Sequence, residues 1–363
     1  MQTSPLLSLH ESAGARLQPE PAPRVLTYGD VPAEYRAATE GCALFDETDR
    51  GRLTVTGEEA PEFLHRLLAN DVRGLEAGAG NRTLLLTPKG KVVHEAELVR
   101  DEETIELSTP PGEAAKLLTS LDMFLFADKV ELTDTTESHA PLALTGPKAD
   151  ALVQSLLGVE PPSETLARLD VEWQGHPVRI VRTWVAGSDG LRLDAGPSGV
   201  EALWRALVEK GAVPCGIVVR DILRVEAGAA QFGDDVDDNV YPQEARLENA
   251  FSLDKGCYIG QEVVAKIDTY GGLNKRMVAL KLEHDDPIPR GTPVTKTEDG
   301  EERELGLVTS WAYSFVLDTG LVLAYLKKRH QDVGMEFTIG GARAEIVALP
   351  VRAGATAIEP DPA

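Results

Sequence analysis

The stretch that is most informative about chemistry is short and rich in glycine, Asp254-Lys-Gly-Cys-Tyr-Ile-Gly-Gln-Glu262. Cys257 lies between Gly256 and Gly260, two residues after Lys255. A helix beginning near Gly260 would point free N–H groups at the thiol, and these donors and Lys255 would favour the reactive thiolate. Glycines also allow a ligand to approach the backbone closely. The alternative is that Cys257 is a small buried residue in a glycine-shaped turn.

The other cysteines do not extend this stretch into a metal site. Cys42 and Cys215 lie far away in the sequence, and no CxxC pair or Cys/His cluster accompanies any of the three. We therefore predict neither a metal site nor a disulfide framework. Reduced thiols and an N-terminus without a signal-peptide pattern predict a cytoplasmic protein. The sequence has no long apolar run, so we do not expect it to span a membrane.

Length and charge narrow the class of protein. The 363 residues suggest two or three domains. Lys and Arg number 36 against 59 Asp and Glu, a formal net charge of −23. A surface this acidic repels phosphate backbones, so non-specific nucleic-acid binding is not expected. The compact basic stretch Lys327-Lys-Arg-His330 is interpreted as a solvated turn; the alternatives are contact with RNA, with a polyglutamate tail or with an acidic partner.

The elements that must position these residues follow a repeated order. The first block consists of a strand at 52–56, a helix opened by Pro61, a hairpin over 83–100, a strand at 104–108 and a second helix. Strands near 178–183 and 191–193 and a helix ending at Gly211 form a similar block. We predict an α+β fold with two ferredoxin-like (split βαβ) units over 26–270.

The two ends and the last third of the chain differ from these blocks. Residues 1–25 and 352–363 lack hydrophobic periodicity and are predicted to be flexible. Between them, residues 271–351 contain short strands separated by turns and acidic loops. This pattern predicts a C-terminal antiparallel β-barrel.

Five motifs resemble one known superfamily. Lys255–Glu262 resembles the KGC[YF]xGQE signature of the YgfZ family of folate-binding proteins, which belongs to the superfamily of the glycine-cleavage T-protein, an aminomethyltransferase. Further matches follow in the superfamily's order, at Phe63–Asp71, Leu86–Lys91, Arg182–Gly190 and Pro214–Gly228. The resemblance covers roughly residues 25–351 and implies two α+β units and a barrel around a central cavity that binds tetrahydrofolate or a substituted folate.

The chemistry of a folate indicates which residues would bind it. Its glutamate tail needs a cation, its pterin N–H groups need a carboxylate, and its flat ring needs apolar walls. Arg220 matches the superfamily's arginine and is the first candidate; the alternative is a surface salt bridge with Asp221 or Glu226. Phe232 is a candidate wall without a hydroxyl, or a core residue.

The remaining candidates for folate binding are Asn70, Asp71, Glu95, Gly256 and Gln261. Asn70 and Asp71 follow the first helix, where they could equally form a cap and turn. Glu95 provides a carboxylate close to the position where the transferases have an aspartate.

Two departures weaken aminomethyl transfer as the function. The transferases' G-x-x-x-D-D pattern reads Gly90-Lys-Val-Val-His-Glu95 here, and Ser188, next to Asp189, replaces the glutamate of T-G-E-x-G. His94 could be a general base, but the sequence shows no partner residue for it. We therefore interpret it as an exposed or hydrogen-bonded histidine.

The resemblance implies an accessory protein that supports the assembly or repair of iron–sulfur clusters, including those of radical enzymes that thiolate tRNA. Folate and the iron–sulfur client enzymes would be its partners, Cys257 the working thiol, and Lys255 the group that tunes it. A single cysteine cannot hold a Cys₄ cluster alone, so any cluster would be shared or transient. The alternatives are a folate-dependent aminomethyltransferase of glycine cleavage and a folate-binding scaffold without chemistry.

Overall fold

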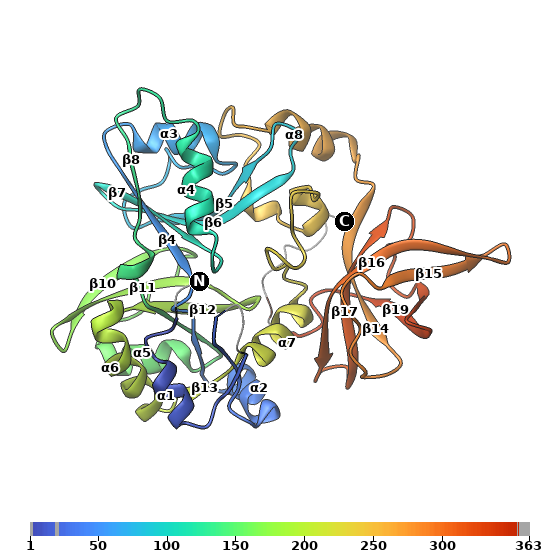
Figure 1. The fold of residues 1–363 in the computed structure, drawn as a ribbon, viewed down its shortest axis with the longest axis horizontal. Coiled ribbons are helices and arrows are strands. Elements are labelled where there is room, and N and C mark those ends of the chain that lie inside the picture. Colours follow the sequence, from blue (N-terminus) through green and yellow to red (C-terminus); the bar gives the residue numbers. More distant parts are fainter. Residues whose placement is uncertain (1–2, 19–21, 354, 356–363) are drawn as a thin grey trace.

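The structure is a computed structural model and describes residues 3–18, 22–353 and 355. Figure 1 shows three parts, two α+β units on the left and a barrel on the right. This arrangement confirms the predicted fold class. No helix within the described part of the chain is long and apolar enough to span a lipid bilayer.

The first unit is a five-stranded sheet with two helices. Its strand order is β5-β6-β7-β4-β8, with bounds β4 (Gly51–Thr56), β5 (Gly80–Leu86), β6 (Val92–Arg100), β7 (Thr104–Thr109) and β8 (Glu131–Asp134). Pro61 occupies the first turn of α3 (Ala60–Leu67), and Phe63 and Leu64 are fully buried in the same apolar cluster as Leu117 of α4 (Ala114–Asp122). Each of these large side chains contributes about 1.5–3 kcal/mol to folding.

The second unit repeats this order of elements. Its sheet runs β10-β11-β12-β9-β3-β13, with bounds β3 (Ala43–Asp46), β9 (Pro141–Thr145), β10 (Arg168–Trp173), β11 (His176–Val185), β12 (Ser188–Asp194) and β13 (Val213–Pro214). The helices are α5 (Ala149–Leu157) and α6 (Gly196–Glu209). β9 to β13 correspond in order to β4 to β8, and β3 is inserted between β9 and β13. Both sheets therefore have the split-βαβ arrangement.

The C-terminal part is the predicted barrel, closed by six antiparallel strands. The order is β14-β17-β16-β15-β18-β19, with bounds β14 (Lys275–Leu282), β15 (Pro293–Glu298), β16 (Glu301–Ser314), β17 (Thr319–Lys327), β18 (Glu336–Ile339) and β19 (Ala342–Val347). In Figure 1, α7 (Ile217–Ala227) lies between the second unit and this barrel. Buried residues of α7, both units and the barrel belong to one apolar cluster that joins the three parts.

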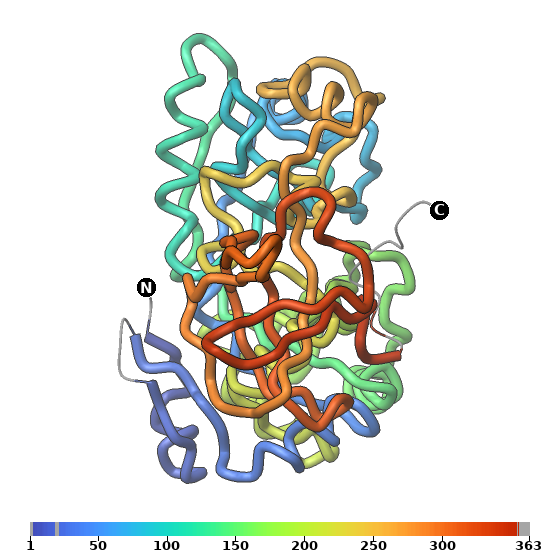
Figure 2. The backbone as a smooth tube through the Cα atoms, turned by 90° about the vertical axis from the view of Figure 1, so that its right-hand side faces the viewer, coloured from blue at the N-terminus to red at the C-terminus, as the bar shows by residue number. Residues whose placement is uncertain are grey.

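The described residues also form the helices α1 (Leu7–Ser12), α2 (Val31–Glu40) and α8 (Gln261–Tyr270). Short 3₁₀ turns lie at Thr136–Ser138, Pro242–Ala245 and Glu248–Ala250. The described residues of the segment predicted to be a flexible lead-in, residues 1–25, carry regular structure. They form α1 and two antiparallel strands, β1 (Arg16–Gln18) and β2 (Arg24–Thr27), and Leu6 and His10 are buried. In Figure 2 this segment folds back on itself at one end of the molecule.

Short segments such as α1 are stabilised by tertiary contacts, which is why hydrophobic periodicity did not reveal them. The predicted tail from Arg352 lies almost entirely outside the described residues.

Candidate functional site

A cavity of about 1120 Å³, here called the central cavity, is lined by three of the predicted folate-binding residues. Arg220, Phe232 and Glu95 come from α7, from the loop after α7 and from β6. The other lining residues are Arg24, Arg50, Arg82, Glu97, Pro110, Pro111, Trp184, Ala186, Gly187, Ile217, Asp221, Arg224, Ala229, Ala230 and Gln231. The sequence motifs therefore converge here from both units.

Arg220 is positioned by α7, which begins after Gly216. A Cβ on Gly216 would lie 2.1 Å from the Leu26 carbonyl oxygen, so only glycine fits where this helix crosses β2. The Arg220 guanidinium pairs with Glu47 at 3.1 Å. Its predicted alternative partners, Asp221 and Glu226, instead contact Arg224 and Tyr35.

Glu47 belongs to a buried network of charges beside the central cavity. Arg192 binds Glu47 at 2.9 Å and also binds Glu97, while Arg50 lies 3.6 Å from Glu97. Burial alone would raise the pKa of Glu47, but the guanidinium groups of Arg220, Arg192 and Arg50 outweigh burial and lower that pKa. Glu47 is therefore ionised at neutral pH and fixes Arg220 in place.

Glu95 lines the cavity, and one of its carboxylate oxygens is buried without a hydrogen-bond partner in the described part of the chain. Arg82 donates two hydrogen bonds to its Oε1, at 3.0 and 2.7 Å. The Oε2 atom is buried and has no hydrogen-bond partner among the described residues. A buried acceptor without a partner costs free energy, so this oxygen is suited to receive an N–H or O–H donor from a ligand.

Aromatic side chains provide apolar walls of the cavity. Phe232 packs against the central apolar cluster and also lines the cavity. Trp184 of β11 lines the same cavity and was missed by the sequence analysis. Glu97 was also missed, although it shares a face of β6 with Glu95 through the two-residue period of a strand.

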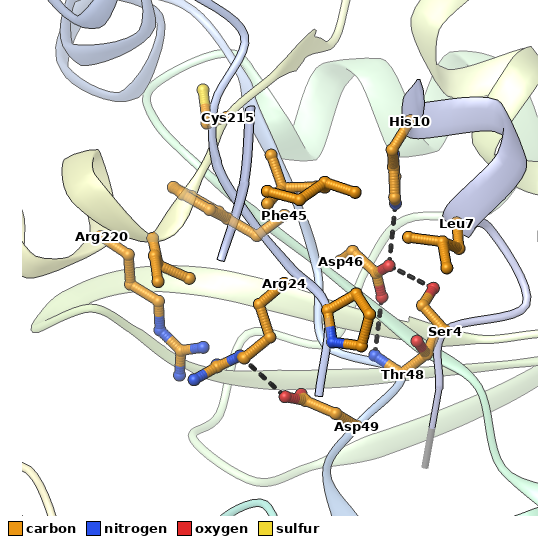
Figure 3. Close-up of a pocket in the computed structure, with 14 residues that line it drawn as sticks. Ser4, Leu7, His10, Arg24, Phe45, Asp46, Thr48, Asp49, Cys215 and Arg220 are labelled. Atoms are coloured by element: carbon orange, nitrogen blue, oxygen red, sulfur yellow. Dashed lines mark hydrogen bonds and ion pairs between the residues drawn. The ribbon is translucent and has the colours of Figure 1, made fainter. Parts of the chain in front are cut away.

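A smaller pocket of about 510 Å³, here called the side pocket, shares Arg24, Ile217 and Arg220 with the central cavity. In Figure 3 the Arg24 guanidinium reaches Asp49, and the Arg220 guanidinium points to the same side of this pocket. The N-terminal segment forms its far wall, where Ser4 and His10 both bind Asp46. The segment predicted to be flexible therefore borders the candidate site.

Cys257 lies on a different surface, the cysteine loop (residues 252–260). The helix after Gly260 is present as predicted, as α8. The thiol is exposed, so the alternative of a buried apolar cysteine is wrong. Cys257 is not among the residues that line the central cavity. A Cβ on Gly260 would lie 2.5 Å from the Thr87 carbonyl oxygen, so this glycine serves close packing on the β5–β6 turn.

Lys255 and Asp71 contact the end of α3. The Lys255 ammonium donates to the His65 carbonyl oxygen and lies 5.1 Å from the centre of the Tyr258 ring. Burial lowers the pKa of Lys255 to about 8. Asp71 pairs with His65 Nδ1 at 3.0 Å. The Lys255 ammonium therefore binds the C-terminal end of α3, and its hydrogen bond and ring contact do not involve the Cys257 thiol.

Asn70, Gly256 and Gln261 also lie outside the lining of the central cavity. Asn70 donates to the carbonyl oxygens of Arg82 and Asn249, at 2.9 and 3.3 Å, and so ties the end of α3 to β5 and to the 3₁₀ turn at 248–250. Gln261 donates to the Leu253 carbonyl oxygen at 3.4 Å, and Gly256 has a φ of +107° with open space around it.

The secondary candidates have local partners. His94 is buried between Ser120, at 2.9 Å, and Glu113, at 3.3 Å, and burial lowers its pKa. Asp189 pairs with Arg182 at 2.9 Å. The ammonium groups of Lys327 and Lys328 donate to backbone carbonyl oxygens. Within the described residues, no group of three or more His, Cys, Asp or Glu side chains is arranged to hold a metal ion.

Comparison with known proteins agrees with this architecture. The GCVT N-terminal domain matches residues 13–255, and the glycine cleavage T-protein C-terminal barrel domain matches residues 275–352. The chain therefore belongs to the glycine-cleavage T-protein family.

Similar relatives are named aminomethyltransferase. One from Thermus thermophilus is 32% identical over 339 residues, covering 90% of this chain and 92% of the relative. One from Symbiobacterium thermophilum is 33% identical over 357 residues, covering 93% of each chain. The crystal structure of aminomethyltransferase T from Bartonella henselae has the same fold, with a TM-score of 0.86, 24% identity and 99% of each chain covered.

Proposed function

We propose that the central cavity binds tetrahydrofolate or a substituted folate. The observation that carries this proposal is the convergence of Arg220, Glu95 and Phe232 on one cavity from three separate segments of the chain. The cavity, about 1120 Å³ with its open mouth included, is lined by both charged and apolar side chains, as small-molecule sites are. Membership of the T-protein family supports the same ligand class.

Each chemical part of a folate has a counterpart in the lining. The Glu95 carboxylate accepts from the pterin N–H groups, and Trp184 and Phe232 provide apolar walls for the ring. Arg24 and Arg220, at the junction with the side pocket, receive the carboxylates of the glutamate tail.

Calorimetry with tetrahydrofolate tests this proposal. Arg220→Ala and Glu95→Gln are each expected to weaken binding on the order of tenfold, as expected for loss of one charge-assisted hydrogen bond. Arg205→Ala, which changes an exposed arginine on α6, is the matched control and retains wild-type affinity. The proposal fails if the folded wild-type protein gives neither heat nor competition with tetrahydrofolate.

We further propose that folate binding serves an accessory role toward iron–sulfur enzymes, as in the YgfZ family. The KGCYIGQE motif and the exposure of Cys257 support this role. Because the thiol lies outside the cavity lining, Cys257 would act on a client protein at the surface while folate occupies the cavity. Any cluster would be shared with that client.

Complementation of a cluster-dependent enzyme in cells tests the accessory role. Cys257→Ala is expected to fold and bind folate normally but to lose support for that enzyme. Full complementation by this variant would refute a working role for the thiol.

Aminomethyl transfer is the second candidate function. The relatives' names and the free carboxylate oxygen of Glu95 in the cavity favour it. It requires folate-dependent release of ammonia from an aminomethylated lipoyl carrier, with a loss in Glu95→Gln and none in Cys257→Ala. Absence of turnover by the wild type would reject it. Folate binding without activity in either assay would leave the scaffold function.

A further inference from the structure

The segment after the barrel crosses back to the wall of the central cavity. β19 ends at Val347, and the backbone N–H of Val351 donates to the Glu226 carbonyl oxygen at 2.7 Å. The next residue, Arg352, is largely buried, with 13% of its side chain exposed. A buried guanidinium needs polar partners, and Arg352 has one on each side.

On one side, Arg352 faces the last turn of α7. Glu226 is fully buried, and its carboxylate accepts hydrogen bonds from Tyr35 and Ser314, both at 2.7 Å. The Nε atom of Arg352 lies 3.7 Å from this carboxylate. Contacts with α2 and the barrel hold Glu226 in place, so Arg352 is anchored at this end.

On the other side, Arg352 donates to the hydroxyl of Ser188, the first residue of β12. Ser188 closes the tip of the β11–β12 hairpin, here called the hairpin tip (Trp184–Asp189). Ala186 and Gly187 form its turn with φ of +52° and +76°. Trp184, Ala186 and Gly187 line the central cavity.

We propose that Arg352 is a positioning residue that sets the separation of two walls of the central cavity. One wall is α7, which contributes Arg220, Asp221 and Arg224, and the other is the hairpin tip. Arg352 joins Glu226 of α7 to Ser188 of the tip from outside the cavity, so the ligand meets walls already in place. Such preorganisation lowers the ordering cost of binding. The effect on ligand affinity rests on the proposed folate binding.

The test compares Arg352→Ala, Arg352→Lys and Ser188→Ala with the wild type. Arg352→Ala is expected to raise the Kd for tetrahydrofolate about tenfold, and Arg352→Lys to recover part of that loss, because lysine can contact one partner. Adding Ser188→Ala to Arg352→Ala should raise the Kd little further, because both substitutions remove the same contact between Arg352 and Ser188. Arg343→Ala, an exposed arginine of the barrel, is the matched control with unchanged affinity.

Hydrogen exchange of the ligand-free protein separates this inference from folate binding. Arg352→Ala is expected to speed exchange of the backbone amides of residues 184–189 while α6 exchanges as in the wild type. Unchanged exchange at the hairpin tip, or wild-type affinity in Arg352→Ala, overturns the inference. If the wild type binds no tetrahydrofolate, the proposed function and the affinity effect fail together, whereas faster exchange at the tip still supports the wall contact.

Discussion

The central cavity and the cysteine loop both contain residues that sequence motifs mark as functional, but they differ in physical character. The cavity is bordered by buried, mutually paired charges such as Glu47 with Arg192 and Arg220. The cysteine loop carries an exposed thiol and packs on the β5–β6 turn through Gly260. Glu95 is the fourth residue of β6, about 10 Å along the extended strand from Val92, where β6 leaves that turn. The comparison teaches that the proposed ligand site and the exposed thiol lie in separate places in this molecule.

Removal of a buried charge beside the cavity has the largest expected effect. Glu47→Gln leaves Arg220, Arg192 and Arg50 short of a counter-charge and is expected to reduce the free energy of unfolding by about 3 kcal/mol. Urea denaturation measures this loss. Glu201→Gln on the exposed face of α6 is the control and should change it by less than about 0.5 kcal/mol. Equal effects of the two variants would contradict the network.

Packing of the cysteine loop is expected to have the next largest effect. Gly260→Ala combines a left-handed φ of +83° with a Cβ that would lie 2.5 Å from the Thr87 carbonyl oxygen. We expect a destabilisation of about 2 kcal/mol. Gly271→Ala, at φ +63° with open space, is the matched control and should cost about 1 kcal/mol, because only the left-handed backbone opposes the alanine there. If both variants melt at the same temperature, close packing of Gly260 on the turn is not the reason for the glycine.

The pH dependence of the free energy of unfolding tests the charged network beside the central cavity. The pKa values of Glu47 and Glu97 are lowered because arginines outweigh the effect of burial. As the pH falls past the ordinary glutamate value near 4.3, the unfolded chain takes up protons that the folded protein does not. These two carboxylates should therefore cost about 1 kcal/mol of stability between pH 7 and pH 4. Glu47→Gln should show a shallower decline, and an identical decline would argue against the ionised network.

The smallest effect is expected at the thiol itself. Because Cys257 is exposed and outside the cavity lining, Cys257→Ala should alter stability by less than about 0.5 kcal/mol and leave the folate Kd unchanged. Alkylation of the wild-type thiol with iodoacetamide should proceed at the same rate with and without saturating tetrahydrofolate. Slower alkylation of Cys257 with tetrahydrofolate bound would indicate that the thiol lies at the central cavity, and would contradict the separation of the two regions.

Local sequence rules account for most of the fold. The two-residue period of the β5–β6 hairpin and the apolar face that follows Pro61 predicted elements that the structure contains. The change of pattern after Gly271 predicted the barrel that begins at Lys275. Local rules missed the N-terminal segment, because α1 has six residues and is stabilised by contacts such as that of His10 with Asp46.

The sequence by itself determined the order of elements, the three-part architecture and the residue types a folate requires, since periodicity, turn residues and motifs are local properties of the chain. Only the tertiary structure decided which of those residues meet. It paired Arg220 with Glu47, brought Trp184 and Glu97 into the cavity lining, turned Lys255 onto α3 and left Cys257 outside. The physical reason is that a buried charge or carboxylate takes its partner from wherever packing brings an opposite charge or donor, a choice that spacing along the chain does not encode.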